Sequence, residues 1–403
     1  MTRRLTLPLA IAAAAAVALP APADATSRRK LQNTRLISQA RGGGMPNGES
    51  SHGVISGDRR WARAIAFQST ASNLIRNDNN GVSDIFVVRR KGHFVNNGSK
   101  WHMGRTTRVS RALHGQANGP SWGPSIGGAF KKRPKCVTFL SSASNLVRHD
   151  TNGKVDAFVV KLNGHKLRRI SLPGGHQPRF DTTQAVTSGD CSRFAFVNNG
   201  YVYVRHKHRT KRLRRGSDPS FGVGKRNRLV FSNRNGVYLS QDGLHGGRLI
   251  VHGGRNPAYN DIKRQVVTYE KRRSGHWQVW SKDLGHSPHV VSKRGGHVGN
   301  GDSTDPVIGN SGYYITFASH ATNLSTDAAR RARDYNGAPD SYLYTNVRNM
   351  TIAQSVFEKG VPAPGGGLNP SMSFYANYIL FDTPNGRRGP NARQVYMRYL
   401  GPV

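Results

Sequence analysis

The sequence predicts an all-β fold built from repeated strand units, and three observations support this prediction. Glycine occurs 46 times in 403 residues, and 36% of the residues are hydrophobic. A glycine inside a helix costs roughly 0.5–1 kcal/mol relative to alanine, so this density argues against a helical bundle and suits a β fold rich in turns. Short β-branched and aromatic segments also recur along the chain, separated by Asn, Gly and Asp.

The N-terminus has the pattern of a secretory signal peptide. Arg3 and Arg4 precede an apolar stretch over residues 5–19, and Ala23-Asp24-Ala25 forms a small-x-small cleavage site. A membrane anchor is the less favoured alternative, because a span needs about 20 apolar residues. No later segment reaches that length, so we expect no transmembrane segment in the mature chain. The sequence therefore predicts a secreted, periplasmic or cell-envelope protein that consists of a signal peptide (1–25), a linker (26–33) and one folded domain (34–403).

Three segments are copies of one another and define the repeat. Ser69–Leu74, Ser141–Leu146 and Ser319–Leu324 share the pattern Ser-x-Ala-Ser/Thr-Asn-Leu. Each is followed by an Asp-x-Asn-Gly-x-x-Asp run and then by an apolar-aromatic strand. Repeats of this kind bury their strand faces against their neighbours, so the repeat sets the architecture.

Weaker copies of the unit extend the pattern over the whole chain and predict seven pairs of strands. The first strand of each pair carries an aromatic residue at its expected end: Phe67, Phe139, Phe196, Phe231, Tyr269, Phe317 and Phe381. A further strand follows each pair, often as basic-apolar-Ser, as in Arg108-Val-Ser110 and Arg169-Ile-Ser171.

The last unit lacks this further strand, and a matching segment lies at the other end of the chain, over Thr34–Ser38. An N-terminal strand that completes the last unit would close a ring and remove two open sheet edges. The sequence therefore predicts a single β-propeller with seven blades, closed by its N-terminal strand. Six blades are the alternative, if one of the two short middle units is not a blade.

Over roughly residues 34–400 the chain resembles the TolB-type, WD-repeat-like propeller family of exported bacterial proteins. The motifs that carry the resemblance are Pro124-Ser-Ile, Pro219-Ser-Phe, Pro306-Val-Ile and Pro370-Ser-Met before the expected inner strands, together with Asp156-Ala-Phe-Val-Val160. The resemblance implies a propeller used for protein interaction, for envelope assembly or as one domain of an enzyme. The chain departs from the family in lacking the extra N-terminal domain of translocation TolB proteins and the usual Pro-Asp-Gly turn.

The Asp-x-Asn-Gly-x-x-Asp runs are candidate calcium loops, because short loops of Asp and Asn supply hard oxygen ligands. The alternative is turn chemistry, in which Asn-Gly gives the left-handed residue of a turn and Asp caps backbone N–H groups. We favour structural turns and keep calcium as the alternative; no other cofactor is expected. The nine residues concerned are Asp78, Asn80, Asp84, Asp150, Asn152, Asp156, Asp334, Asn336 and Asp340.

The charge is strongly positive, since 60 Lys and Arg stand against 21 Asp and Glu for a formal net charge of +39. The densest basic run predicts a hairpin with a solvated cationic patch, which would attract a polyanion with salt-dependent affinity. His206 and His208 share a face of that hairpin, but no third ligand lies nearby in sequence. No nucleic-acid motif is visible, so we expect no specific nucleic-acid partner. The patch comprises Arg205, Lys207, Arg209, Lys211, Arg212, Arg214 and Arg215.

The two cysteines, Cys136 and Cys191, would meet an oxidising compartment after export, so a disulfide between them is one expectation and two separate core residues are the other. Three Asn-Gly-x-Ser stretches, at residues 47–50, 118–121 and 300–303, precede inner strands and suggest a partner-binding rim, with loop chemistry as the alternative.

Motifs of nucleophilic, zinc-dependent and phosphate-binding enzymes are absent, and we expect no catalytic residues. The predicted function is a non-enzymatic interaction or scaffolding module with an unidentified protein partner at a propeller rim. The first alternative is a cationic binder of an anionic cell-envelope polymer. The second, less favoured, is a hydrolase or lyase with a site at the channel mouth.

Overall fold

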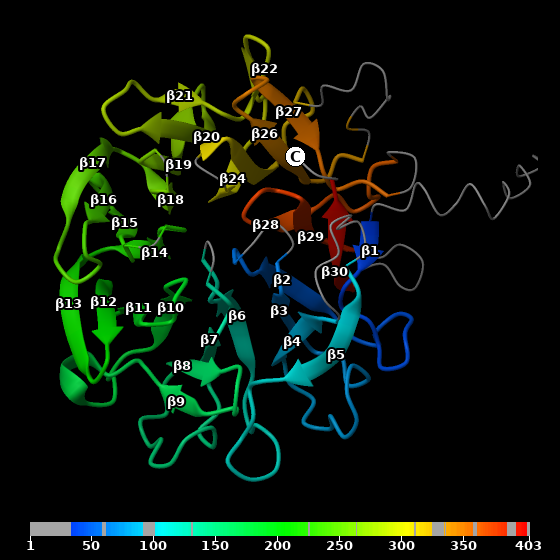
Figure 1. Cartoon of the computed structure of the whole chain (residues 1–403), viewed down its shortest axis with the longest axis vertical. Coiled ribbons are helices and arrows are strands. Elements are labelled where there is room, and N and C mark those ends of the chain that lie inside the picture. The colour runs from blue at the N-terminus through cyan, green and yellow to red at the C-terminus, as the bar shows by residue number, and fades with distance from the viewer. Residues whose placement is uncertain are drawn as a thin grey trace, which may run out of the picture.

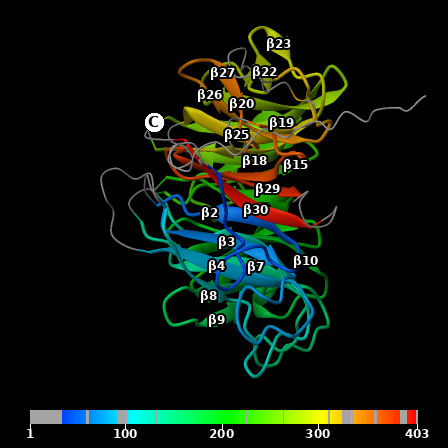
Figure 2. The same cartoon turned by 90° about the vertical axis from the view of Figure 1, so that its right-hand side faces the viewer.

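The computed structural model describes residues 34–58, 62–91, 101–129, 132–224, 226–262, 264–309, 312–324, 334, 336–357, 361–384 and 392–400. The predicted signal peptide and linker lie outside these residues. Within them the chain forms a seven-bladed β-propeller, in which the blades are arranged in a ring around a central axis (Figure 1). In the side view the blades stack as a flattened disc (Figure 2). Among the described residues no helix has the length and apolar character needed to cross a bilayer.

Each blade is a four-stranded antiparallel sheet whose strands run in order from the axis outward. Blade 1 contains β2 (Ser50–Ile55), β3 (Ala64–Ser69), β4 (Asp84–Arg90) and β5 (Met103–Arg108). Blade 2 contains β6 (Ser121–Ile126), β7 (Cys136–Ser141), β8 (Asp156–Lys161) and β9 (Leu167–Arg169). Blade 3 contains β10 (Thr182–Thr187), β11 (Arg193–Asn198), β12 (Tyr201–His206) and β13 (Arg209–Arg215). Blade 4 contains β14 (Ser217–Phe221), β15 (Leu229–Asn233), β16 (Gly236–Ser240) and β17 (Arg248–His252).

Blade 5 contains β18 (Arg255–Asn260), β19 (Val266–Arg273), β20 (His276–Asp283) and β21 (His289–Val290). Blade 6 contains β24 (Ser303–Ile308), β25 (Tyr314–Ser319), β26 (Asp340–Thr345) and β27 (Met350–Ala353). Blade 7 contains β28 (Leu368–Met372), β29 (Tyr378–Pro384), β30 (Arg393–Tyr399) and β1 (Thr34–Leu36). A small hairpin of β22 (Lys293–Arg294) and β23 (His297–Val298) and a 3-10 turn, η2 (Pro173–Gly175), complete the described elements.

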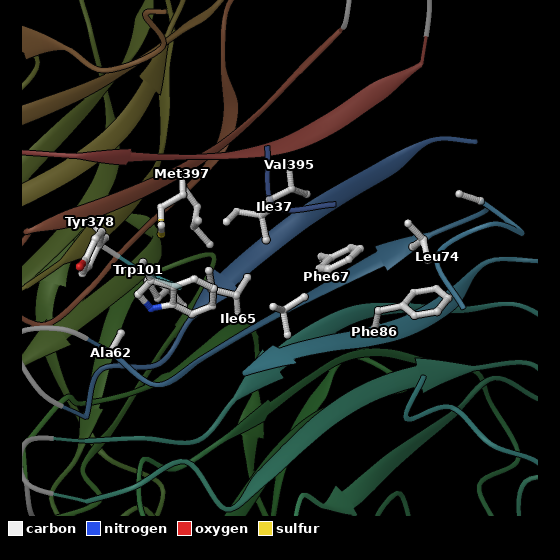
Figure 3. Close-up of a cluster of buried hydrophobic side chains, with 14 residues drawn as sticks. Ile37, Ala62, Ile65, Phe67, Leu74, Phe86, Trp101, Tyr378, Val395 and Met397 are labelled. Carbon is white, nitrogen blue, oxygen red and sulfur yellow. The ribbon is translucent and has the colours of Figure 1, made fainter. Parts of the chain in front are cut away.

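The N-terminal strand closes the ring, as predicted. β1 pairs antiparallel with β30, and Leu36 lies opposite Tyr396. The Ser38 hydroxyl donates a hydrogen bond of 2.9 Å to Gln394. Ile37 enters the apolar cluster between blades 7 and 1, where Figure 3 shows it beside Val395 and near Phe67. Closure thus joins the two ends of the chain through both hydrogen bonds and core packing.

An aromatic pair marks the second and third strands of nearly every blade. Phe67 stacks on Phe86 with ring centroids 5.9 Å apart, and Phe139 stacks on Phe158 at 5.8 Å. The aromatic residues predicted at strand ends lie inside the strands, since Phe67 is followed by two further residues of β3. Stacked pairs of this kind contribute beyond their buried area and recur because each blade repeats the same packing problem. The equivalent pairs in other blades are Phe196–Tyr203, Phe231–Tyr238, Phe317–Tyr342 and Phe381–Tyr396.

Bulges bend the inner strands next to the axis. At the bulge, pairing with the second strand of the blade is interrupted. In six of the seven inner strands the first residue of this interruption has a positive φ, as at His52 (53°) and Asp305 (54°). The prolines expected before the inner strands instead lie within them, next to these bulges, where the ladder is already interrupted and a missing N–H costs little.

Candidate functional site

The predicted basic run forms a hairpin at the outer edge of blade 3. β12 and β13 are its two strands, and Lys207 lies at the tip with a φ of 55°. β13 is the outermost strand of its sheet, so one of its edges carries no partner strand. Five of its seven residues are both basic and exposed. They are Arg209, Lys211, Arg212, Arg214 and Arg215.

Aromatic rings hold the arginines of β13 in place. The guanidinium carbons of Arg212 and Arg215 lie 4.9 and 5.1 Å from the centre of the Tyr201 ring. Arg214 lies 5.2 Å from the ring of Tyr238, which belongs to blade 4. Among the described residues none of these arginines forms an ion pair with a carboxylate. Arg214 and Arg215 donate their Nε–H groups to the Gly246 carbonyl and the Tyr201 hydroxyl, which leaves the terminal N–H groups of these guanidinium groups to bind an anion.

One member of the predicted patch has a different role. Arg205 is half-buried, donates a hydrogen bond to the Thr210 hydroxyl and has a lowered pKa because burial penalises its charge and Arg168 lies nearby. It packs within the sheet rather than on the exposed edge. The surface available to a ligand is therefore the β13 edge with Lys207 at its tip.

A second cationic surface lies on blade 1, and the sequence did not predict it. A groove of about 1000 Å³ runs between the segment after β1 and strand β5. Its exposed arginines are Arg41, Arg76, Arg105 and Arg111. These residues are distributed over 70 positions of sequence, so no local run of charge predicts the groove. The groove could be inferred only from the predicted ring closure, which brings the N-terminal segment beside blade 1.

The first two Asp-x-Asn-Gly-x-x-Asp loops are built around an arginine. In blade 1 a guanidinium nitrogen of Arg108 donates to Asp78 at 2.7 Å, to Asp84 at 3.0 Å and to Gln116 at 2.9 Å. The arginine thus occupies the centre where a cation bound by both carboxylates would lie. Burial raises the pKa of Asp78, and Arg108 opposes that rise.

Blade 2 repeats this cluster with Arg169, which contacts Asp150 at 3.0 Å, Asp156 at 2.8 Å and Gln177 at 2.8 Å. Asn152 donates to Asp156 and to a backbone carbonyl, as Asn80 does to Asp84 in blade 1. In these two loops the aspartates thus accept hydrogen bonds from arginine and asparagine side chains, and the structural-turn interpretation stays a prediction. Calcium binding to them stays a prediction that must compete with an internal guanidinium.

The third loop, with Asp334, Asn336 and Asp340 in blade 6, differs from the first two, because no described arginine contacts its carboxylates. The Ser355 hydroxyl donates to Asp340 at 2.5 Å, and Asn336 donates to a backbone carbonyl. Both carboxylate oxygens of Asp334 are shielded from solvent without a hydrogen-bond partner. In the part of the chain that the structure describes, no group of three or more His, Cys, Asp or Glu side chains has the arrangement of a metal site.

A disulfide joins Cys136 on β7 to Cys191 in the turn before β11, with Cα atoms 6.1 Å apart. It links blade 2 to blade 3 across 55 residues of sequence. Cys191 has a positive φ of 60°, and a side chain on the neighbouring Gly127 would lie within 2.3 Å of its sulfur. The glycine therefore makes room for the crosslink.

The Asn-Gly-x-Ser stretches clasp the Ser-Asn-Leu turns. Asn47 donates to the Ser72 hydroxyl at 2.8 Å and accepts the backbone N–H of Ser72 at 3.0 Å. Asn118 and Asn300 repeat both contacts in blades 2 and 6. These asparagines stabilise the conformation of the neighbouring turn, as expected if the stretches have a structural role. A partner at this rim stays a prediction.

One mouth of the central channel is apolar. A cavity of about 190 Å³ lies where the inner strands of six blades end. Aliphatic, aromatic and glycine residues dominate its lining, with a few Ser and Thr hydroxyls and no charged side chain among the lining residues described. The apolar side chains at or next to the ends of those strands are Ile55, Ile126, Val186, Phe221, Ile308 and Met372.

Two buried acids and one half-buried acid lie near the bulges toward the opposite mouth, and each joins neighbouring blades. Asp382 of blade 7 accepts the backbone N–H of His52 in blade 1 at 2.6 Å. Glu270 of blade 5 accepts that of Asp305 in blade 6 at 2.9 Å. Asp218 of blade 4 accepts the backbone N–H of blade 5's bulge residue. Burial raises the pKa of Asp382 to about 7 and also raises that of Glu270. These carboxylates have structural partners, as expected of residues that bridge the blades.

Comparisons with known proteins found structural likenesses but no sequence match. No protein-family model matches the chain, and no curated protein matches its sequence. Among solved structures, a prolyl endopeptidase is 11% identical with a TM-score of 0.50; the match covers 87% of this chain and 48% of the endopeptidase. The propeller domain of a trilobed protease from Pyrococcus furiosus is 10% identical with a TM-score of 0.48, over 86% and 96% of the two chains. A TolB from Agrobacterium tumefaciens, described as putative, is 14% identical with a TM-score of 0.39, over 74% and 94%.

The likeness to the endopeptidase concerns the fold alone and assigns no activity, because propellers of one architecture serve unrelated functions. The TolB-type resemblance is one of several structural likenesses and not the strongest of those given above. The chain spans about half the length of the endopeptidase that it matches.

Proposed function

We propose that this propeller is an exported, non-enzymatic binding module that attaches to an anionic polymer of the cell envelope through its cationic outer edges. This was the first alternative of the sequence analysis. The β13 edge carries the proposal, because it presents five exposed basic residues that have no acidic partner among the described residues. The arginine-lined groove on blade 1 supplies a second contact surface.

The physical basis is the release of counterions from a polyanion. Such binding weakens steeply with salt, by roughly 0.7–0.9 in the slope of log affinity against log salt for each charge neutralised on a nucleic acid. Arginine suits phosphate and carboxylate groups because its planar N–H groups pair with two oxygens. Rings that fix the guanidinium groups reduce the side-chain entropy lost on binding.

A protein partner at a rim is less well supported by the described surface. The large hydrophobic residues that are exposed lie on four separate loops, at Leu113, Phe180, Val347 and Val361. A docking face for a protein partner usually gathers such residues in one patch. A hydrolase or lyase site at the channel mouth has less support still, because the buried acids there accept backbone N–H groups of the next blade.

Binding of inorganic polyphosphate of defined length, measured by fluorescence anisotropy across a salt series, tests the proposal. We expect a steep negative salt slope for the wild type. Replacing Lys211, Arg212, Arg214 and Arg215 by Gln should reduce the magnitude of that slope by about 3. The matched control replaces four exposed basic residues of other surfaces by Gln: Arg133, Lys135, Arg234 and Arg294.

An equal loss in both quadruple variants would mean that net charge, and not the β13 edge, determines binding. No binding by the wild type at low salt would refute the proposed function. The search would then turn to protein partners of the rim.

A further inference from the structure

A pair of facing positions recurs in the outer half of every blade. The first position is at or near the start of the third strand of the blade. The second position lies on the outermost strand, opposite the residue that comes two positions after the first. In blade 1 these are Asp84 and Arg108, because Arg108 pairs with Phe86, two residues after Asp84. In blade 2 they are Asp156 and Arg169, since Arg169 pairs with Phe158. An internal arginine compensates the buried acid in both blades.

Blades without an acid at the first position do not need that arginine. Blade 5 has Gln278 there, and Val290 occupies the facing position opposite Trp280. Blade 7 has Gln394, and Leu36 occupies the facing position. In blades 1 and 2 a serine hydroxyl donates a hydrogen bond to the acid. In blade 5 the equivalent serine, Ser292, donates to the side-chain oxygen of Gln278 at 2.6 Å. The remaining pairs are Tyr201 with Arg212 in blade 3 and Gly236 with Leu249 in blade 4.

Blade 6 breaks this relation between acid and arginine. Its first position is Asp340, and the residue facing it, opposite Tyr342, is Ala353. A second acid, Asp334, stands where Asp78 and Asp150 stand in the other loops. Neither carboxylate takes part in an ion pair among the described residues, although the same pair of acids holds a guanidinium in two other blades.

The unpartnered oxygens are buried. Both carboxylate oxygens of Asp334 are shielded and lack a hydrogen-bond partner, whereas Asp78 and Asp150 each accept from an arginine. Asp340 accepts a hydrogen bond from the Ser355 hydroxyl. A buried carboxylate without a positive or donor partner is strongly unfavourable. Asp340 has the Ser355 donor and Asp334 has none, so a cation between the two acids would compensate the charge of both.

We propose that blade 6 binds a divalent cation, with Ca²⁺ the best match, between the carboxylates of Asp334 and Asp340, at the place that an arginine guanidinium occupies in blades 1 and 2. Two carboxylates balance two positive charges, and Ca²⁺ prefers oxygen ligands in flexible geometry. Water would complete the coordination. The Asn336 side-chain oxygen already accepts the backbone N–H of Ala338 at 2.9 Å, so this residue shapes the turn rather than binding the ion.

The test is the thermal stability of the full chain after treatment with EDTA and then titration with CaCl₂. Calcium at 100 times its Kd should raise the melting temperature by about 3 °C for a domain of this size. Calorimetric titration of the same sample should give one site per chain. MgCl₂ at the same ionic strength controls for unspecific salt effects.

The decisive variant is Ala353→Arg, which installs the arginine of blades 1 and 2. We expect it to fold, to be at least as stable as the calcium-free wild type and to lose the calcium response. Asp334→Asn should lose at least tenfold in calcium affinity. The converse variant, Arg108→Ala, should gain a second calcium-responsive site in blade 1 if it folds.

The proposal is overturned if the wild type shows no calcium-dependent shift, because the two acids are then neutralised by protons or by another group. It is equally overturned if Ala353→Arg and Asp334→Asn both keep the full calcium response, because the ion then binds elsewhere. Polyphosphate binding measured with and without calcium separates this site from the proposed function, since neither depends on the other.

Discussion

Asp382 provides a direct test of how the ring is held together at the seam of blades 7 and 1. Its side chain is fully buried and accepts the backbone N–H of His52 at 2.6 Å and the Asn369 amide at 2.7 Å. Both donors reach the same carboxylate oxygen, and the other oxygen has no partner. Burial therefore raises its pKa to about 7 from an ordinary value of 3.8.

The sign of the pH dependence follows from proton binding. Between pH 4 and 7 the folded state retains a proton that the unfolded state has released, so the free energy of unfolding falls as pH rises. Each pH unit costs about 1.4 kcal/mol, which gives a total of about 4 kcal/mol by pH 7 and no further change above it. Asp382→Asn keeps an oxygen for both donors and cannot ionise. The variant should match the wild type near pH 4 and exceed its stability by up to about 4 kcal/mol at pH 8.

Urea unfolding followed by tryptophan fluorescence at pH 4.5, 6, 7 and 8 measures this difference, and other titrating groups cancel between the two proteins. The matched control is Asp58→Asn, because Asp58 is also buried but forms an ion pair with Arg63 at 2.6 Å. That variant should be less stable than the wild type at pH 8. If Asp382→Asn is also destabilised at pH 8, or if its difference from the wild type does not change with pH, the inferred cost of ionising Asp382 is wrong.

Three further predictions concern the scaffold. Deletion of residues 34–38 removes the β1–β30 ladder and the buried Ile37, so the melting temperature should fall sharply; an unchanged value would contradict closure by β1. Replacement of Cys136 and Cys191 by Ala should cost about 4 kcal/mol from loop entropy, measured by urea unfolding, and an equal stability of the wild type with and without reductant would count against the crosslink. Arg169→Met leaves Asp150 and Asp156 buried without their cation and should cost about 3–5 kcal/mol, whereas Arg179→Met, an exposed change, should cost little.

The sequence predicted the parts of the fold that repeat. Seven strand pairs, their aromatic residues and the missing last strand are visible because each blade must solve the same packing problem. The bulges near the axis were not predicted, since residues as different as His52, Gly123 and Asn256 occupy the same left-handed position. What they share is a backbone conformation, and their bonding partners come from the preceding blade.

The candidate sites were predictable only where their residues are adjacent in sequence. The β13 edge was visible as a charge run, but the arginines of the blade 1 groove come together only when the ring closes. The Asp loops were visible as motifs, yet their environment depends on a residue 13 to 30 positions away. Arg108 can neutralise the carboxylate pair in its blade, and Ala353 at the same position in blade 6 cannot. Strand pairing places these residues opposite the acids, so the local sequence of the loop does not reveal them.

The contrast between the interior and the surface explains why the excess of positive charge points to binding. Inside blades 1 and 2 a buried arginine faces two acids, and where the acid is replaced by Gln the facing residue is apolar, so the interior is nearly balanced in charge. The sequence has 60 basic against 21 acidic residues, and within the described part of the chain this excess must then lie mostly on the surface. Folding gains nothing from such an excess, because like charges repel one another in the compact state. The rings beneath the arginines of β13 position that charge, and this arrangement supports the proposal of an anionic ligand.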